Sequence, residues 1–163
     1  MRAPSIPVLL VASAILLTGC AAQDAPPSRS VSAQEGTAKT GTGELRTDLA
    51  PLVDRYPAVA DAESAAWSSG TLAGDDRVPG PSSHWIDAVV VLPQASYDEL
   101  RAAHEYTESA QRPSVADALA ASVPDGALLV SDELDDGFGP LEGSSDVYLS
   151  DSTHSVVIVS VFE

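Results

Sequence analysis

Apolar positions alternate or cluster in five segments of the chain in patterns that predict β-strands. Three of these patterns are weak and cover residues 65–72, 127–130 and 147–149. The other two, 84–92 and 156–162, are apolar on both faces, as in the run Val89-Val90-Val91. Two apolar faces are typical of a strand in the middle of a sheet. We therefore expect the centre of the sheet at 84–92.

Helical spacing predicts further elements around these strands. Apolar residues recur at this spacing between Leu45 and Tyr56, with Asp48 as a candidate N-cap. Ser96 and Glu99 have the spacing of a capping box. Ser114 is the candidate cap of the next element. The expected helices cover residues 45–56, 96–109 and 114–123.

The order of these elements predicts the fold class. Strands and helices follow one another as α-β-β-α-α-β-β-β, and such an order favours an antiparallel sheet. We expect a single α+β domain over residues 44–163. Its mainly antiparallel sheet has four to five strands, with two to three helices packed on one side.

The beginning of the chain has the pattern of an export signal. Arg2 supplies a positive charge, and residues 6–17 are mostly apolar. A helix needs about 20 apolar residues to cross a bilayer, so this run is too short for a span.

The four residues that end this region, Leu17-Thr18-Gly19-Cys20, resemble the lipobox of bacterial membrane lipoproteins. The resemblance implies that the signal peptide covers residues 1–19 and that the thiol of Cys20 carries a diacylglycerol group. It also implies a location on the outer face of the cell membrane. The alternative is an ordinary secretory signal cleaved after Ala21-Ala22. Because Cys20 is the only cysteine, it has no disulfide partner within the chain, which favours lipidation.

Small and polar residues dominate between Ala21 and Gly43, where large apolar residues are nearly absent. Such a segment cannot bury enough surface to offset the entropy lost on ordering. Together with the lipidated Cys20, it is expected to form a disordered tether over residues 20–43, which contains Lys39. A chain that starts at Glu44 is expected to be as stable as the mature protein.

Composition limits the class of partner. Acidic residues number 24 against 8 basic ones, for a net charge of −16. Nucleic acids and anionic headgroups are bound by clustered basic residues, so neither is an expected partner. Two interpretations of the negative charge stay open: it keeps the protein soluble, or it serves to bind a cationic partner. The overall bias resembles small uncharacterised lipoproteins of high-GC actinobacteria.

No catalytic, cofactor or metal site is predicted from the motifs. Lipidation occupies Cys20, and Lys39, the only lysine, lies in the tether, so a Ser-x-x-Lys site is excluded. The three histidines are far apart in the sequence and lack the spacing of zinc ligands.

An acidic segment, 132–142, has one feature of a calcium loop, because Gly137 falls at the sixth position of an EF-hand. Leu134 at the third position and Gly143 at the twelfth do not fit that motif. Two interpretations stay open, a solvated acidic loop and a calcium site of another geometry.

The candidate binding residues lie between two strands that each carry a tryptophan. Arg77 and Ser82 belong to a proline-containing loop, and His84 and Trp85 follow it. Prolines reduce the entropy that a loop loses on binding. If the two strands pair, Trp67 and Trp85 are expected to stack across them, either as part of the core or as a binding platform.

The expected function is therefore a non-catalytic binding or structural module of the cell envelope, with the membrane and a possible envelope protein as partners. The alternative is a small envelope hydrolase whose site is assembled only by folding. A deep pocket with at least two of five polar residues would favour the hydrolase: Ser82, His84, Asp87, His104 and His154.

Overall fold

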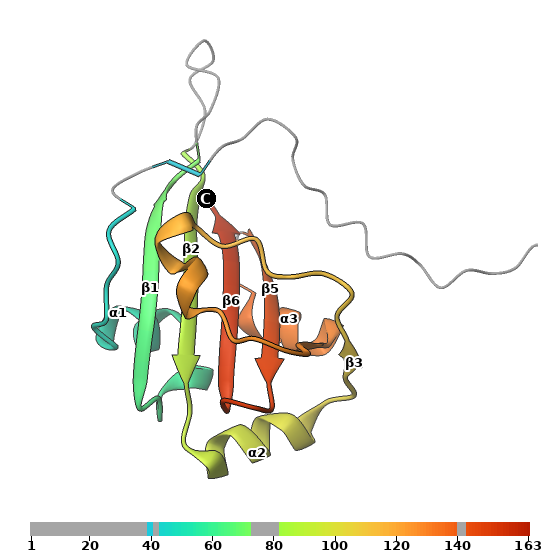
Figure 1. The fold of residues 1–163 in the computed structure, drawn as a ribbon. Helices are drawn as coiled ribbons and strands as arrows, with labels where there is room; N and C mark the ends of the chain where they lie inside the picture. The colour runs from blue at the N-terminus through green and yellow to red at the C-terminus, as the bar shows by residue number, and fades with distance from the viewer. Residues whose placement is uncertain (1–38, 41–42, 73–81, 140–142) are drawn as a thin grey trace, which may run out of the picture. The chain divides into compact units, whose positions relative to one another are not determined.

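The computed structural model describes residues 39–40, 43–72, 82–139 and 143–163, which all belong to one compact unit. A single six-stranded antiparallel sheet runs through it in the order β1-β2-β6-β5-β4-β3 (Figure 1). The fold is α+β, as predicted, with one strand more than expected. The strands are β1 (Ser64–Thr71), β2 (His84–Val91), β3 (Thr107–Glu108), β4 (Leu129–Val130), β5 (Gly143–Ser150) and β6 (Ser155–Phe162).

The two strands with apolar residues on both faces lie in the middle of the sheet. β2 and β6 pair along their whole length, from His84 opposite Phe162 to Val91 opposite Ser155. Each has a second long neighbour, β1 beside β2 and β5 beside β6. The prediction of a central 84–92 strand is confirmed.

Helices cover both faces of the sheet, and the expectation that they pack on one side is wrong. Leu52 of α1 and Leu134 of α3 join one apolar cluster, whereas Leu119 of η2 joins a separate cluster with Val89 and Val157. Because the central strands are apolar on both faces, each face needs a cover. The helical elements are α1 (Ala50–Arg55), η1 (Pro57–Val59), α2 (Gln94–Ala103), η2 (Asp117–Ser122) and α3 (Asp132–Phe138).

The first helix is shorter than the sequence predicts. It begins at Ala50, with Leu49 rather than Asp48 as the N-cap residue. Before it, Arg46 pairs with Trp67: the Arg46 N–H donates to the Trp67 carbonyl oxygen at 2.8 Å, and the Trp67 N–H donates back at 2.9 Å. Because Arg46 pairs with β1, residues 45–48 do not belong to the helix.

The predicted capping box is also wrong, because α2 begins two residues earlier, after Pro93. The hydroxyl of Ser96 lies 3.2 Å from a carboxylate oxygen of Asp61 instead of capping the helix. The helix ends at Ala103, and β3, the unexpected sixth strand, pairs with β4. The element expected at 114–123 is the 3-10 helix η2, which starts at Asp117.

The acidic segment is a helix for most of its length rather than a loop. In α3, Leu134 and Phe138 are one turn apart and both are buried. Acidic side chains occupy the first turn, where they interact favourably with the helix dipole. Asp135 accepts a hydrogen bond from the Val147 backbone N–H at 2.8 Å. Residues 140–142 lie outside the described part of the chain.

Candidate functional site

Two of the binding residues predicted from the sequence, His84 and Trp85, do not share a surface. His84 and Trp85 are consecutive on β2 and therefore point to opposite faces of the sheet. His84 is exposed and stacks on Phe162, with ring centroids 5.8 Å apart. Ser82 is exposed just before the strand, and Arg77 lies outside the described residues.

The two tryptophans do not stack across β1 and β2. Trp67 lies opposite Ala88, and Trp85 lies opposite Gly70, so the indoles are on opposite faces of the sheet. Both are buried, and each has a partner for its ring N–H. Trp67 donates to the Asp48 carbonyl oxygen at 2.9 Å, and Trp85 donates to that of Thr40 at 2.8 Å.

A partly buried ion pair lies on the Trp85 face of the sheet. Asp87, fully buried on β2, accepts hydrogen bonds from the ammonium of Lys39, which lies 2.7 Å from both carboxylate oxygens. The same ammonium donates to the Ser114 carbonyl oxygen at 2.8 Å and lies 5.5 Å from the centroid of the Trp85 ring. Lys39 and Thr40, which the composition assigns to the tether, therefore contact the domain.

Burial raises the pKa of Asp87, although the Lys39 ammonium and a hydrogen bond from the Ala116 backbone N–H act in the opposite direction. That N–H lies 2.6 Å from Asp87 Oδ2 and holds the start of η2 against β2. On β1, Ser68 lies directly opposite Asp87 and is fully buried. Its hydroxyl has no hydrogen-bond partner among the described residues.

A cavity of about 410 Å³ lies beside the ion pair. Its lining comes from three parts of the chain: the N-terminal segment at residues 39–40 and 43, Trp85 of β2, and residues 115–118 at the start of η2. None of the five polar residues proposed as hydrolase candidates lines this cavity. The lining residues are Lys39, Thr40, Gly43, Trp85, Val115, Ala116, Asp117 and Ala118.

The sequence contains a signal for this site that belongs to no motif. Asp87 is a charged residue within a strand that is otherwise apolar on both faces, and buried carboxylates are rarely unpaired. Lys39 is the only lysine in the chain. Pairing two residues 48 positions apart requires the fold, because neither belongs to a motif.

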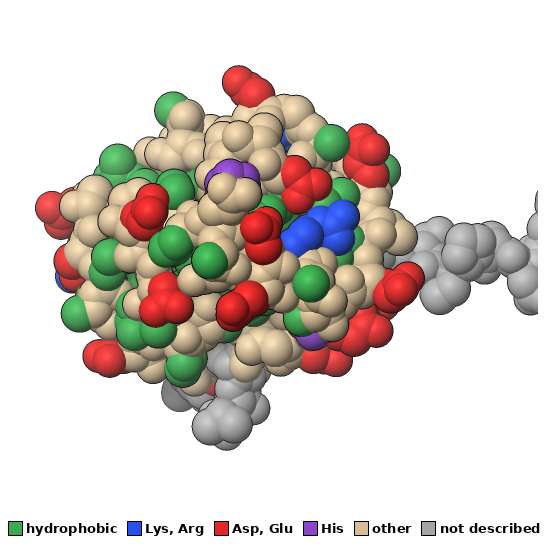
Figure 2. All heavy atoms as spheres, turned by 90° about the horizontal axis from the view of Figure 1, so that it is seen from below, with side chains coloured by type: hydrophobic (Ala, Val, Ile, Leu, Met, Phe, Trp, Pro, Cys, Tyr) green, Lys and Arg blue, Asp and Glu red, His purple; other side chains and the backbone are tan. Residues whose placement is uncertain are grey.

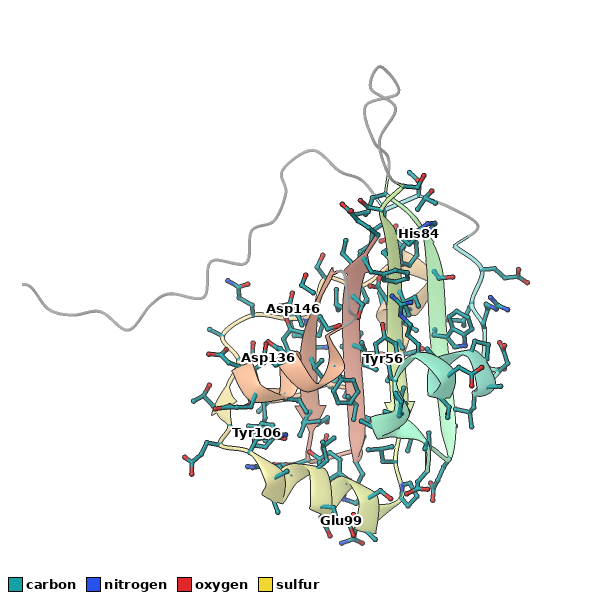
Figure 3. All side chains as sticks on the ribbon, turned by 180° about the vertical axis from the view of Figure 1, so that it is seen from behind. Tyr56, His84, Glu99, Tyr106, Asp136 and Asp146 are labelled. Atoms are coloured by element: carbon teal, nitrogen blue, oxygen red, sulfur yellow. The ribbon has the colours of Figure 1, made fainter. Side chains whose placement is uncertain are left out.

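The histidines lie in three separate places. His104 contacts Tyr106 near the end of α2, and His154 contacts Tyr97 at the turn between β5 and β6. In Figure 3, His84 is at one end of the sheet and Tyr106 near the other. Within the described part of the chain, no group of three or more His, Cys, Asp or Glu residues is placed to hold a metal ion.

A second polar group is buried on the opposite face of the sheet, between α1 and α3 (Figure 3). The Tyr56 hydroxyl donates to Ser160 Oγ at 2.7 Å, and Ser160 contacts Ser145, which donates to the Phe138 carbonyl oxygen at 2.9 Å. Burial raises the pKa of Tyr56. Since these hydroxyls satisfy one another, their role is to join β5, β6 and the two helices.

The surface view from below shows acidic side chains spread over the face rather than gathered at one point (Figure 2). Of the helices in the described residues, none combines the length and apolarity that a membrane span requires. Comparisons with protein-family models, with curated proteins and with solved structures find no match to this chain.

Proposed function

We propose that this protein is a lipoprotein anchored through Cys20 to the outer face of the cell membrane. The support is the lipobox-like sequence Leu17-Thr18-Gly19-Cys20 after a short apolar run. A single acyl chain binds a membrane only marginally, so the two or more chains of a lipoprotein make the anchor durable. In this proposal the folded domain is a non-catalytic module that binds or supports another component of the envelope.

The observation that carries the binding part of the proposal is the ion pair between Lys39 and Asp87. Lys39 lies on the anchor side of the domain in the sequence, and its ammonium contacts a carboxylate in the middle of the sheet. Lys39 is therefore attached to a central strand, and Lys39, Thr40 and Gly43 line the cavity. This arrangement suits a module that presents a binding site at the end of its tether.

The chemistry of the cavity favours binding over catalysis. Its polar groups are already engaged: the Lys39 ammonium contacts Asp87 and Ser114, and the Thr40 hydroxyl donates to the Thr71 carbonyl oxygen at 2.8 Å. The remaining surface is mostly apolar, with the exposed carboxylate of Asp117 at its edge. Such a lining provides shape and charge complementarity to a ligand.

The anchor is tested by substituting Cys20. We expect Cys20→Ala to abolish membrane attachment while export continues, and cell fractionation with a salt wash measures this. Ser28→Ala, in the same segment, is the matched control and should stay with the membrane. Retention of exported and processed Cys20→Ala on washed membranes would show that the lipid-anchor proposal is wrong.

The binding role is tested by site-specific crosslinking in intact cells. A photo-crosslinking residue at Asp117 lies at the edge of the cavity, and the same residue at Glu99 lies on the exposed side of α2. We expect a discrete crosslinked product from position 117 that position 99 does not give. Identical product patterns from the two positions would remove the cavity as the binding site.

A further inference from the structure

The ammonium of Lys39 has a complete set of partners, and all of them belong to the domain. An ammonium carries three N–H donors and no acceptor. Here the acceptors are the two carboxylate oxygens of Asp87 at 2.7 Å and the Ser114 carbonyl oxygen at 2.8 Å. The face of the Trp85 ring adds a cation–π contact at 5.5 Å. Together these groups have the composition of a receptor for a primary ammonium.

The receptor is held in place by contacts that do not involve Lys39. Asp87 and Trp85 belong to β2, which pairs with β1 on one side and β6 on the other. The Ala116 N–H fixes the second carboxylate oxygen at 2.6 Å, and this contact also positions the neighbouring Ser114. The receptor is therefore expected to persist when the lysine leaves.

The occupant lies at the edge of the sheet and is partly exposed, whereas the receptor belongs mainly to a buried inner strand. The Lys39 side chain is 24% exposed, whereas that of Asp87 is fully buried. Its neighbour Thr40 is held at the edge of the sheet, where its N–H and its hydroxyl donate to the Thr71 carbonyl oxygen at 2.9 and 2.8 Å. The Thr40 carbonyl oxygen accepts a hydrogen bond from the Trp85 ring N–H at 2.8 Å. Edge strands accept added strands from other chains, so a segment held in this way is replaceable.

We propose that Asp87, the Trp85 ring and the Ser114 carbonyl form a binding site for a primary ammonium on an unbranched alkyl chain. Lys39 fills the site within the chain, and an external lysine side chain fills it by exchange. The adjacent cavity of about 410 Å³ is the entry path for the alkyl chain. This inference deepens the proposed binding function and rests on it.

The charge of the protein supports this choice of ligand. A net charge of −16 attracts cations and repels anions over the whole surface. Asp117 places a further carboxylate at the edge of the cavity. Once Lys39 has left, the buried carboxylate of Asp87 lacks its counter-ion, and a cation from solution restores the pair.

The first test is rescue of a variant that lacks the lysine. In the exported domain carrying Cys20→Ala, Lys39→Ala vacates the site. We expect n-butylammonium, which matches the lysine side chain, to raise the melting temperature of Lys39→Ala by about 5 °C, on the scale of one recovered buried contact. Neutral n-butanol and branched tert-butylammonium should not do so, and Lys39→Ala/Asp87→Asn should not respond to the amine.

Wild-type protein provides a measurement that does not depend on folding of the variant. Because Lys39 is the only lysine, ¹⁵N-lysine labelling gives one side-chain ammonium signal in NMR spectra. We expect excess n-butylammonium to shift this signal to that of a solvent-exposed lysine. An unchanged signal in the wild type together with no rescue of Lys39→Ala would overturn the proposal. Rescue by butanol as strong as by the amine would overturn it as well.

Peptides distinguish the sources of the lysine. A peptide of residues 34–46 represents a second copy of this chain, and a polar peptide of equal length with one lysine represents a foreign partner. Binding of the first alone to Lys39→Ala identifies exchange between copies, and binding of both identifies a general lysine site. Binding of neither peptide contradicts exchange in trans. A crosslink at position 117 that persists in that case leaves the cavity as a binding site for another ligand.

Discussion

The Lys39 ammonium lies 2.7 Å from both carboxylate oxygens of Asp87, across 48 residues of sequence. Removing one member of a buried ion pair leaves the other without compensation, and this usually costs more than the pair contributes. We therefore expect the stability of the domain to depend on Lys39, which lies outside its six strands and its helices.

Truncation at Glu44 is expected to destabilise the domain, contrary to the expectation from composition. The loss of Lys39 leaves Asp87 buried without its counter-ion, at a cost of about 3 kcal/mol, the lower end of the usual range because Lys39 is partly exposed. Urea unfolding of chains that begin at Gln34 and at Glu44 measures the difference. Equal free energies of unfolding would show that the ion pair contributes nothing.

The stability lost in Lys39→Ala is expected to depend on pH. Burial already raises the pKa of Asp87 above 3.8, and without the ammonium it rises further. A carboxyl group with a raised folded-state pKa binds more protons folded than unfolded, so the free energy of unfolding falls as pH rises through that window. The deficit of Lys39→Ala relative to wild type should be smallest near about pH 4 and should grow toward neutral pH.

Urea unfolding between pH 4 and pH 8 measures this deficit. The matched control compares Asp87→Asn with Lys39→Ala/Asp87→Asn, because neither variant has the titrating carboxyl group. The difference between these two variants should not vary with pH. A constant deficit for Lys39→Ala across the range would contradict the assignment to Asp87.

Two buried serines are expected to respond oppositely to alanine. The Ser68 hydroxyl has no partner among the described residues, so Ser68→Ala removes an unsatisfied group and should leave stability unchanged or higher. The Ser145 hydroxyl donates to the Phe138 carbonyl oxygen at 2.9 Å. Loss of this hydrogen bond in Ser145→Ala should lower the free energy of unfolding by about 1–2 kcal/mol. Thermal unfolding of both variants measures this difference in stability. A loss of stability in Ser68→Ala as large as that in Ser145→Ala would contradict the prediction.

Substituting alanine is expected to have opposite effects on stability at two glycines, Gly143 and Gly137. A Cβ at Gly143 would collide with the Val161 carbonyl oxygen and approach Phe162 Cα to 2.8 Å, so Gly143→Ala should disrupt the start of the β5–β6 ladder. A Cβ at Gly137, in α3, would meet nothing within 4 Å. Gly137→Ala should therefore raise the free energy of unfolding by about 0.5–1 kcal/mol, because alanine has a higher helix propensity than glycine. Melting temperatures that fall equally in both variants would contradict this assignment.

The sequence by itself determined the elements whose signal is local. The two strands that are apolar on both faces, β2 and β6, were recognisable because periodicity reports burial directly. Their order with the other elements led to the α+β class and the antiparallel sheet. The anchor prediction also rests on adjacent residues, those that end at Cys20.

Tertiary structure alone decided which residues meet. Trp67 and Trp85 lie on opposite faces because the register of β1 against β2 sets Trp67 opposite Ala88, and one residue of register changes the face of every side chain. Helices cover both faces because the central strands bury both. Lys39 belongs to the domain rather than to the tether because a buried carboxylate 48 residues away requires a cation. That requirement exists only after folding has removed Asp87 from water.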